Sequence, residues 1–351
     1  MCFAAFQSSE SPPPVKSFDR DRYIRIQTGA VGLAEALDAA IGEALAAGAR
    51  NLFFSGSGGA AVLMQPAAFL LQRRGSLPVY FESAAELNAA GHAQLGQSSI
   101  VVIPSLSGTT RESVELLRLC KAKGATVLAL VGHAEAPLAL GADRSFVNFA
   151  EDDTSCESFY LQSLAIALSV LKARGEYDAY DQTLAELKLL PPLLAAVKDQ
   201  FDAKAEAYAV KIEAEPYHLM TAAGNCWTEA WYFGMCILEE MQWIRTRPVN
   251  AADFFHGPLE LVEQGVSVML FKGEDAYRPL ADRVERFIRQ YTDKVFVLDT
   301  ADFAMPGISP ETRALVAPAI LASALERLSE YLAARRNHPL TTRRYYKRIS
   351  Y

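Results

Sequence analysis

The sequence predicts an α/β protein built from parallel sheets. Three observations support this class: two series of short apolar runs, helical stretches between the runs, and glycine-bearing loops where two of the runs end. Strands that alternate with helices are typical of parallel, doubly wound sheets, whose ligands bind at the carboxyl ends of the strands. The chain has 351 residues, of which 51% are hydrophobic, and this length accommodates two packed domains.

The first half of the chain alternates regularly between the two kinds of segment. After a polar, proline-rich start, residues 32–47 are rich in Ala, Leu and Glu and predict a helix that ends at Gly48. Predicted strands follow at 51–54, 77–81, 99–104, 126–131 and 144–149. Predicted helices lie at 60–73, 110–123, 136–140 and 157–173. This order indicates one parallel sheet with helices between its strands.

The second half repeats this plan. Residues 177–207 predict two helices, which link the first domain to the second. Predicted strands then lie at 217–223, 243–247, 266–271 and 294–298, and predicted helices at 228–241, 276–291 and 318–335, with a short segment of unassigned type at 259–263. We therefore expect an N-terminal extension (1–27), a first domain (28–175), a helical linker (176–210), a second domain (211–335) and a C-terminal tail (336–351).

Composition excludes several classes of protein. Lys and Arg total 34 against 41 Asp and Glu, so the net charge is −7, opposite in sign to a nucleic-acid-binding protein. The five cysteines are odd in number and form no C-x-x-C pair, which predicts reduced thiols, no disulfide framework and no metal site. The chain shows no secretory signal and no apolar run of about 18 residues, so we expect a cytoplasmic protein without membrane spans.

Two predicted strands end in small loops that run directly into helices. Residues 55–60 read Ser-Gly-Ser-Gly-Gly-Ala, and residues 105–110 read Ser-Leu-Ser-Gly-Thr-Thr. Backbone N–H groups at a helix start and Ser or Thr hydroxyls donate to phosphate oxygens, and glycine allows close approach. Neither loop has the Gly-Lys-Ser/Thr of a nucleotide triphosphate site, which favours a single phosphate. The candidate phosphate-binding residues are Gly56, Ser57, Gly58, Ser105, Ser107, Gly108 and Thr110.

Two other interpretations of these loops stay open. Ser, Thr and Gly between a strand and a helix are also ordinary turn and capping residues. In addition, Gly56, Gly58 and Ala61 fit the dinucleotide pattern G-x-G-x-x-A, and Glu82 ends the next strand, where a ribose-binding acid would lie. A second hydroxyl-rich loop is not needed by a dinucleotide domain, so the pair of loops favours a phosphorylated small molecule.

Residues 54–58 and 103–110, with the Ser-x-Ser-Gly-x-Thr form of the second loop, resemble the sugar isomerase (SIS) domain, a phosphosugar-binding α/β module. Over residues 30–335 the chain resembles the tandem SIS pair of fructosamine-6-phosphate deglycases and of the isomerase half of glucosamine-6-phosphate synthase. The resemblance implies two tandem SIS domains, each a flavodoxin-like, doubly wound parallel sheet flanked by helices. Cys2 follows Met1 as a glutaminase nucleophile would, but we interpret this as coincidence.

The resemblance also implies catalytic residues. Glu240 precedes His256 by 16 residues (256 minus 240), as in the family's Glu and His-Gly-Pro loop. In the family the Glu is the base, and the His comes from the neighbouring subunit, which implies a homodimer with shared active sites. The family loop equivalent to 151–155 touches the sugar, which makes Thr154 and Ser155 possible sugar contacts. Taken singly, Glu240 could be a surface carboxylate and His256 a turn residue.

One departure from the family pattern narrows the implied reaction. Aminosugar isomerases carry a Lys three residues before the catalytic Glu and a second Glu seven before it, where this chain has Ile237 and Phe233. The resemblance is therefore closer to deglycases, which cleave a 6-phosphorylated fructosamine or glucosamine-type adduct to glucose 6-phosphate and an amino acid. This reaction transfers no electrons and implies no cofactor. The alternatives are an aldose-ketose isomerase, an aminosugar deaminase and a non-catalytic phosphosugar sensor.

Overall fold

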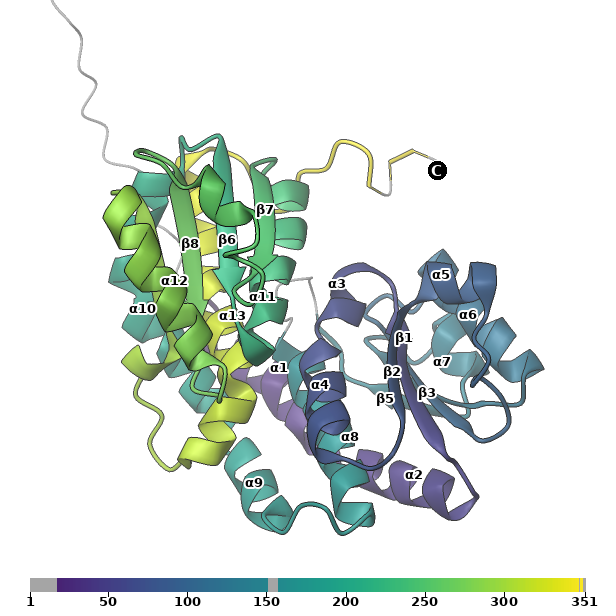
Figure 1. Cartoon of the computed structure of the whole chain (residues 1–351). Helices are drawn as coiled ribbons and strands as arrows, with labels where there is room; N and C mark the ends of the chain where they lie inside the picture. Colours follow the sequence, from purple (N-terminus) through teal and green to yellow (C-terminus); the bar gives the residue numbers. More distant parts are fainter. Residues whose placement is uncertain (1–17, 151–156, 347, 350–351) are drawn as a thin grey trace, which may run out of the picture.

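Two parallel sheets, each in its own lobe, form the centre of the molecule (Figure 1). The computed structural model describes residues 18–150, 157–346 and 348–349. The strand order is β2-β1-β3-β4-β5 in the first sheet and β7-β6-β8-β9 in the second, and every pairing among them is parallel. The predicted α/β class with parallel sheets flanked by helices is confirmed. None of the helices in the described part of the chain is long and apolar enough to cross a membrane.

The first sheet follows the predicted strands closely. Its strands are β1 (Asn51–Gly56), β2 (Val79–Ser83), β3 (Ser99–Ser105), β4 (Thr126–Val131) and β5 (Arg144–Val147). Every residue of β1 and β3 is buried, as expected for strands that helices cover on both faces. Because β2 and β3 lie on opposite sides of β1, the strand order reverses there, and a crevice opens at the carboxyl ends of β1 and β3.

The helices of the first lobe include two that were not predicted. They are α1 (Arg20–Gly32), α2 (Ala34–Ala46), α3 (Gly58–Val62), α4 (Gln65–Arg74), α5 (Ala84–Ala90), α6 (Arg111–Ala122), α7 (Pro137–Gly141) and α8 (Glu157–Ala173). The helix predicted at 32–47 is α2, while α1 begins inside the predicted N-terminal extension. The helix predicted at 60–73 is divided into α3 and α4. Ser83 caps the unpredicted α5 by accepting from the Glu86 N–H, a capping-box pattern visible in the sequence.

The second lobe contains a long π-helix and two long α-helices. Its elements are α9 (Tyr180–Leu187), α10 (Leu190–Ile212), β6 (Tyr217–Ala222), η1 (Gly224–Cys226), α11 (Trp227–Tyr232), the π-helix η2 (Phe233–Met241), β7 (Arg245–Asn250), η3 (Pro258–Leu261), β8 (Ser267–Lys272), α12 (Arg278–Tyr291), β9 (Val295–Asp299), η4 (Thr300–Asp302) and α13 (Pro310–Arg335). The last helix begins before the predicted residue 318, because the Ser309 hydroxyl caps it by accepting from the Thr312 N–H. The domain boundaries stay predictions.

The buried helix α8 joins the two lobes. It packs on α2 and α4 of the first lobe and on α1 and α13 at the junction (Figure 1). At its start, the fully buried carboxylate of Glu157 accepts hydrogen bonds from the Tyr23 hydroxyl of α1 (2.8 Å) and the Ser323 hydroxyl of α13 (2.9 Å). One turn later, the Tyr160 hydroxyl donates to Glu229 of α11 (2.7 Å). Hydrogen bonds that are this deeply buried fix the orientation of α1, α13 and α11 around α8.

Burial perturbs the pKa of one carboxyl in this junction. Glu229 is 1% exposed, and its burial raises its pKa well above the ordinary range of a glutamic acid. The folded protein therefore keeps a proton on Glu229 that the unfolded chain loses above about pH 4.3. Because the folded state binds more protons in this range, the contribution of Glu229 to stability falls as pH rises toward its folded pKa.

We predict that Glu229→Gln flattens the dependence of stability on pH. Glutamine does not titrate, so the free energy of unfolding of the variant should fall less between pH 5 and pH 8 than that of the wild type, by up to about 1.4 kcal/mol per pH unit. Urea denaturation at a series of pH values measures this. The exposed Glu260→Gln is the control and should match the wild type. Parallel curves for Glu229→Gln and the wild type would contradict the prediction.

Candidate functional site

A cavity of about 420 Å³ lies between the lobes, at the carboxyl ends of β1 and β3. Its walls come from the two predicted loops, from α8 and the segment before it, from η2 and from the C-terminal segment, which we define as residues 336–346. The lining residues are Gly56, Ser57, Gly58, Gly59, Ala60, Leu63, Ser83, Ala85, Pro104, Ser105, Leu106, Ser107, Thr110, Glu112, Val131, Asn148, Ala150, Ser158, Phe159, Gln162, Tyr232, Cys236, Glu240, Met241 and Tyr346. Both loops and Glu240 therefore face the same space.

The first loop presents an unpartnered hydroxyl at the end of β1. The Ser57 Oγ atom is buried and has no hydrogen-bond partner among the described residues. Gly58 has φ +56°, a backbone conformation that favours glycine, and an added Cβ on Gly56 would lie 2.9 Å from the Pro104 ring. Glycine at position 56 thus lets the loop lie close to the second loop, and Ser57 lines the cavity.

The second loop is held in shape by its own hydroxyls. The Gly108 N–H donates to Ser105 Oγ (3.1 Å), which also lies 3.2 Å from Thr110 Oγ1. The Thr109 N–H donates to Ser107 Oγ (3.3 Å). Thr110 is the N-cap of α6, but its side chain does not cap the helix. Gly108 does not line the cavity; its φ of +62° makes the turn that places the hydroxyls there.

No lysine or arginine is found among the described lining residues of the cavity. The charged side chains in the lining are the carboxylates of Glu112 and Glu240. An anion in this cavity would therefore be held by hydroxyls and by the unpaired N–H groups at the start of α6, whose dipole also favours negative charge. This arrangement is suited to one phosphate and lacks the lysine of a triphosphate site.

The π-helix η2 carries Glu240 into the cavity. Tyr232, Cys236 and Glu240 line the cavity at intervals of four residues, which puts them on one side of the helical segment. The neighbouring Glu239 faces away, because its Oε1 atom accepts from the Thr246 hydroxyl (2.7 Å) and N–H (3.2 Å) of β7. The structure thus distinguishes two adjacent carboxylates, and it is Glu240 that reaches the site.

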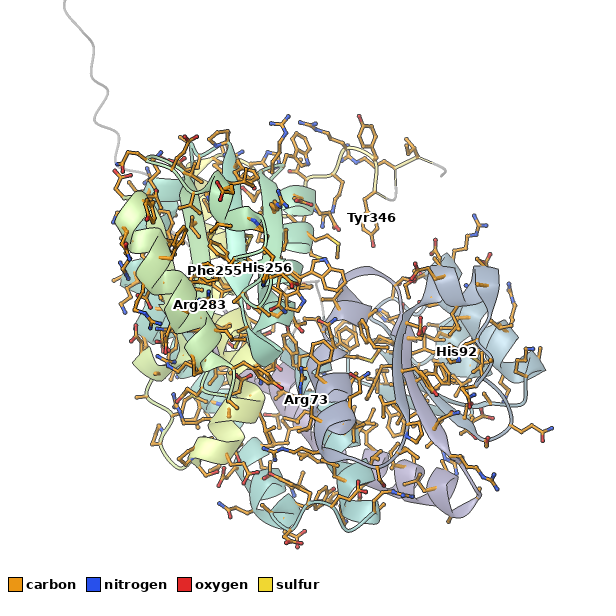
Figure 2. All side chains as sticks on the ribbon, viewed as in Figure 1. Arg73, His92, Phe255, His256, Arg283 and Tyr346 are labelled. Atoms are coloured by element: carbon orange, nitrogen blue, oxygen red, sulfur yellow. The ribbon has the colours of Figure 1, made fainter. Side chains whose placement is uncertain are left out.

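The C-terminal segment contributes residues that sequence reasoning missed. Arg343 forms an ion pair with Glu240, with 2.9 Å between Nε and Oε1, and Tyr346 lines the cavity. Figure 2 shows Tyr346 on the segment that extends from the second lobe above the first. Cys236 and Gln162 were missed as well. The four-residue spacing from Glu240 to Cys236 and Tyr232 was a usable signal in the sequence, whereas the approach of the C-terminal segment left none.

His256 lies away from this cavity in its own chain. It is exposed, in the turn that follows β7, and it is not among the described lining residues. The turn is anchored by Phe255, whose ring stacks edge-to-face on Phe287 (5.4 Å between centroids) and lies under the Arg283 guanidinium (4.0 Å) (Figure 2). The chain alone therefore does not bring Glu240 and His256 together.

The two possible sugar contacts, Thr154 and Ser155, lie outside the described residues. The residues that flank them, Asn148, Ala150 and Ser158, line the cavity. Asn148 is held in place by donating to the Ile26 carbonyl of α1 (3.2 Å) and to the Ser158 hydroxyl (3.3 Å). The role of Thr154 and Ser155 stays a prediction.

The equivalent edge of the second sheet is filled by the protein itself. The N–H of Asn225, after β6, donates to the Asp275 carboxylate (3.0 Å), and so does the N–H of Tyr277 (2.9 Å). Gly224 has φ +60° beside this carboxylate. The Asp275 carboxylate thus accepts hydrogen bonds from the N–H groups that would otherwise be available to a bound anion. Across the described residues, no group of three or more His, Cys, Asp or Glu side chains could hold a metal ion.

Comparison with known proteins confirms the resemblance to tandem SIS proteins. The model of the SIS domain family matches residues 46–172. Fructosamine deglycase of Bacillus subtilis (strain 168) is 29% identical over 303 residues, which cover 86% of this chain and 92% of that protein. Fructoselysine 6-phosphate deglycase of Escherichia coli (strain K12) is 27% identical over 296 residues, covering 84% and 85%.

A solved structure supports the same relationship. The crystal structure of a Bacillus subtilis protein named as a candidate phosphosugar isomerase superposes with a TM-score of 0.82 at 29% identity. The superposition covers 86% of this chain and 93% of that chain, so it includes both lobes. The two-sheet architecture of this chain is therefore shared over nearly its whole length.

We predict that Gly108→Ala destabilises the protein. An added Cβ would collide with the Cβ of Ala136, and the positive φ disfavours alanine, so the free energy of unfolding should fall by about 1–3 kcal/mol. Gly42→Ala, in the middle of α2 with no atom within 4 Å of the added Cβ, is the matched control and should be neutral or stabilising by about 0.5–1 kcal/mol. Urea denaturation compares them, and equal effects would contradict the account of the loop.

Proposed function

We propose that this SIS-domain protein is a deglycase, which cleaves 6-phosphorylated fructosamine adducts of amino acids to glucose 6-phosphate and the free amino acid. One observation carries the proposal: the Glu240 carboxylate and both hydroxyl-rich loops face one cavity. The likeness to two deglycases over more than four fifths of the chain supports the same reaction. We also include in the proposal a cytoplasmic location and a doubly wound first sheet, which its strand order supports.

The loops would hold the 6-phosphate. Ser57, Ser105, Ser107 and Thr110 offer hydroxyls, and the backbone around Gly56, Gly58 and Gly108 offers N–H groups or the turns that expose them. Hydrogen bonds to a charged acceptor contribute about 1.5–3 kcal/mol each. Four hydroxyls and a helix start can therefore bind a phosphate in a cavity that has no cation in its described lining.

Glu240 would then act as the base at the other end of the sugar chain. It removes a proton from C1 of the ketoamine, a proton is delivered to C2, the nitrogen loses its proton and the C2 oxygen gains one, so that the ketoamine becomes an imine between C1 and the nitrogen with a hydroxyl at C2. Water adds to C1, the C1–N bond breaks, and the amine leaves with a proton. Substrate and one water thus give glucose 6-phosphate and the amino acid. A positioned acid or base contributes about 10²- to 10⁴-fold.

The acid in this scheme would be His256 of a second subunit. His256 is exposed and lies outside the cavity of its own chain, so it is available to the cavity of another copy. Histidine is the side chain that most often serves as a general acid or base, which suits proton delivery. We therefore propose a homodimer with shared active sites.

Two alternatives are less well supported. Ring chemistry by a lysine would need an amine near Glu240, but position 237 is a buried isoleucine and the described lining contains no lysine. This observation disfavours an aminosugar isomerase or deaminase of that type. A non-catalytic phosphosugar sensor would use the same loops, and it differs in predicting no role for Glu240 beyond binding.

We predict that Glu240→Gln reduces release of glucose 6-phosphate from a fructosamine 6-phosphate by at least about 10²-fold, because the amide cannot accept the C1 proton. Binding of glucose 6-phosphate, followed by calorimetry, should change little. Glu239→Gln is the matched control, since that side chain bonds to Thr246, and it should keep most activity. Full activity in Glu240→Gln would overturn the assignment, and a wild type that binds but cleaves no adduct would favour the sensor.

A second prediction concerns the shared site. Glu240→Gln and His256→Ala proteins, each inactive alone, should regain up to about a quarter of wild-type activity when their subunits exchange, because half of the dimers become heterodimers with one intact site. Turnover after verified exchange measures this. Failure to recover activity would show that both residues act within one subunit or that His256 has another role.

A further inference from the structure

The C-terminal segment is fixed to the end of the helix that carries Glu240. The Gln242 side chain donates to the His338 carbonyl (2.8 Å), and Arg336 donates to the Gln242 carbonyl (3.2 Å). Trp243, with a positive φ of 57°, lies under the Arg344 guanidinium (3.9 Å from the ring centroid). These contacts determine where the residues between 338 and 344 lie relative to η2.

This anchoring places Arg343 against Glu240. The Arg343 side chain is 12% exposed, and its Nε lies 2.9 Å from Glu240 Oε1. The same guanidinium donates to the carbonyls of Leu340 (2.6 Å) and Thr342 (3.0 Å), so it is oriented by its own segment. A guanidinium is a planar fork that matches a carboxylate. A positioned carboxylate-binding group therefore lies against Glu240, at the margin of the cavity.

The order of groups in the substrate gives this arginine a role. Phosphate at C6 binds at the loops of the first lobe, and the reacting C1 and C2 lie at Glu240. The amino acid is attached at C1, so it extends beyond Glu240, on the side away from the phosphate. Arg343 is paired with Glu240, and Tyr346 of the same segment lines the cavity, so this segment is next to the base.

We propose, building on the proposed function, that Arg343 binds the carboxylate of the substrate's amino acid and exchanges its ion pair with Glu240 for one with the substrate. Without substrate, Arg343 is paired with Glu240. A substrate carboxylate that takes the place of Glu240 at the guanidinium keeps Arg343 partnered and leaves the Glu240 carboxylate next to C1. The arginine thus gives the site a means of recognising the amino acid part of the substrate.

A pair of substrates that differ in one group tests this role. The 6-phosphorylated fructosamines of glycine and of methylamine differ only in the carboxylate. We expect wild-type kcat/KM to be about 10- to 100-fold higher for the glycine adduct. In Arg343→Met this ratio should fall to near one, mainly through loss of the glycine adduct's advantage. Arg348→Met, which removes an exposed arginine that has no part in this anchoring, is the control and should keep the wild-type ratio.

Two further measurements keep the result interpretable. Arg343→Lys retains the charge without the fork, and it should give an intermediate ratio even if the methionine variant fails to fold. Calorimetric affinities of both adducts for the Glu240→Gln protein, with and without Arg343→Met, report recognition without turnover. Lack of cleavage by the wild type would overturn the proposed function, whereas an Arg343-dependent affinity ratio would still support this inference. An unchanged ratio in both Arg343 variants would overturn it.

Discussion

The site depends on the hydrogen bonds that the buried carboxylate of Glu157 accepts. The cavity has one wall in each lobe, so its shape exists only while the lobes keep one orientation. Glu157 holds that orientation by accepting hydroxyls from α1 and α13 at the start of α8, and Tyr160 extends the network to Glu229 of α11. Removing one partner would leave a buried polar group unsatisfied, which costs about 1–3 kcal/mol. The network thus stabilises this one orientation of the two lobes relative to other orientations.

The two sheets show how one architecture can be used in two ways. At the edge of the first sheet, the Ser57 hydroxyl is buried and unpartnered among the described residues, and the start of α6 has no side-chain cap. At the edge of the second sheet, Asp275 takes the equivalent N–H groups, so that edge is closed by an internal anion. A chain with a net charge of −7 attracts no anion through its overall field. Binding of an anion therefore depends on nearby N–H groups and hydroxyls. Of the two sheet edges, it is the edge of the first sheet that leaves such groups available.

The strands and both loops could be predicted from the sequence, because apolar periodicity and turn residues are local signals, whereas Glu240 was chosen through the resemblance to the SIS family. Glu239 and Glu240 could not be separated by chemistry alone, since the helix that carries them is a π-helix, and it is the contact of Glu239 with Thr246 and that of Glu240 with Arg343 that distinguish the two. The start of α13 was misplaced because Pro318 looked like a helix start and lies inside the helix. Arg343 could not be assigned, because its position depends on contacts of the C-terminal segment with residues about 100 positions earlier.

The central claim is that one cavity holds the phosphate at the first lobe and the reacting carbons at Glu240. The most direct test is a crystal structure of the Glu240→Gln protein with a bound fructosamine 6-phosphate. The account predicts phosphate oxygens within hydrogen-bond distance of the Ser57, Ser105 and Thr110 hydroxyls, and C1 and C2 of the sugar beside the side chain at position 240. A phosphate bound elsewhere, or a sugar whose C1 lies away from position 240, would contradict it.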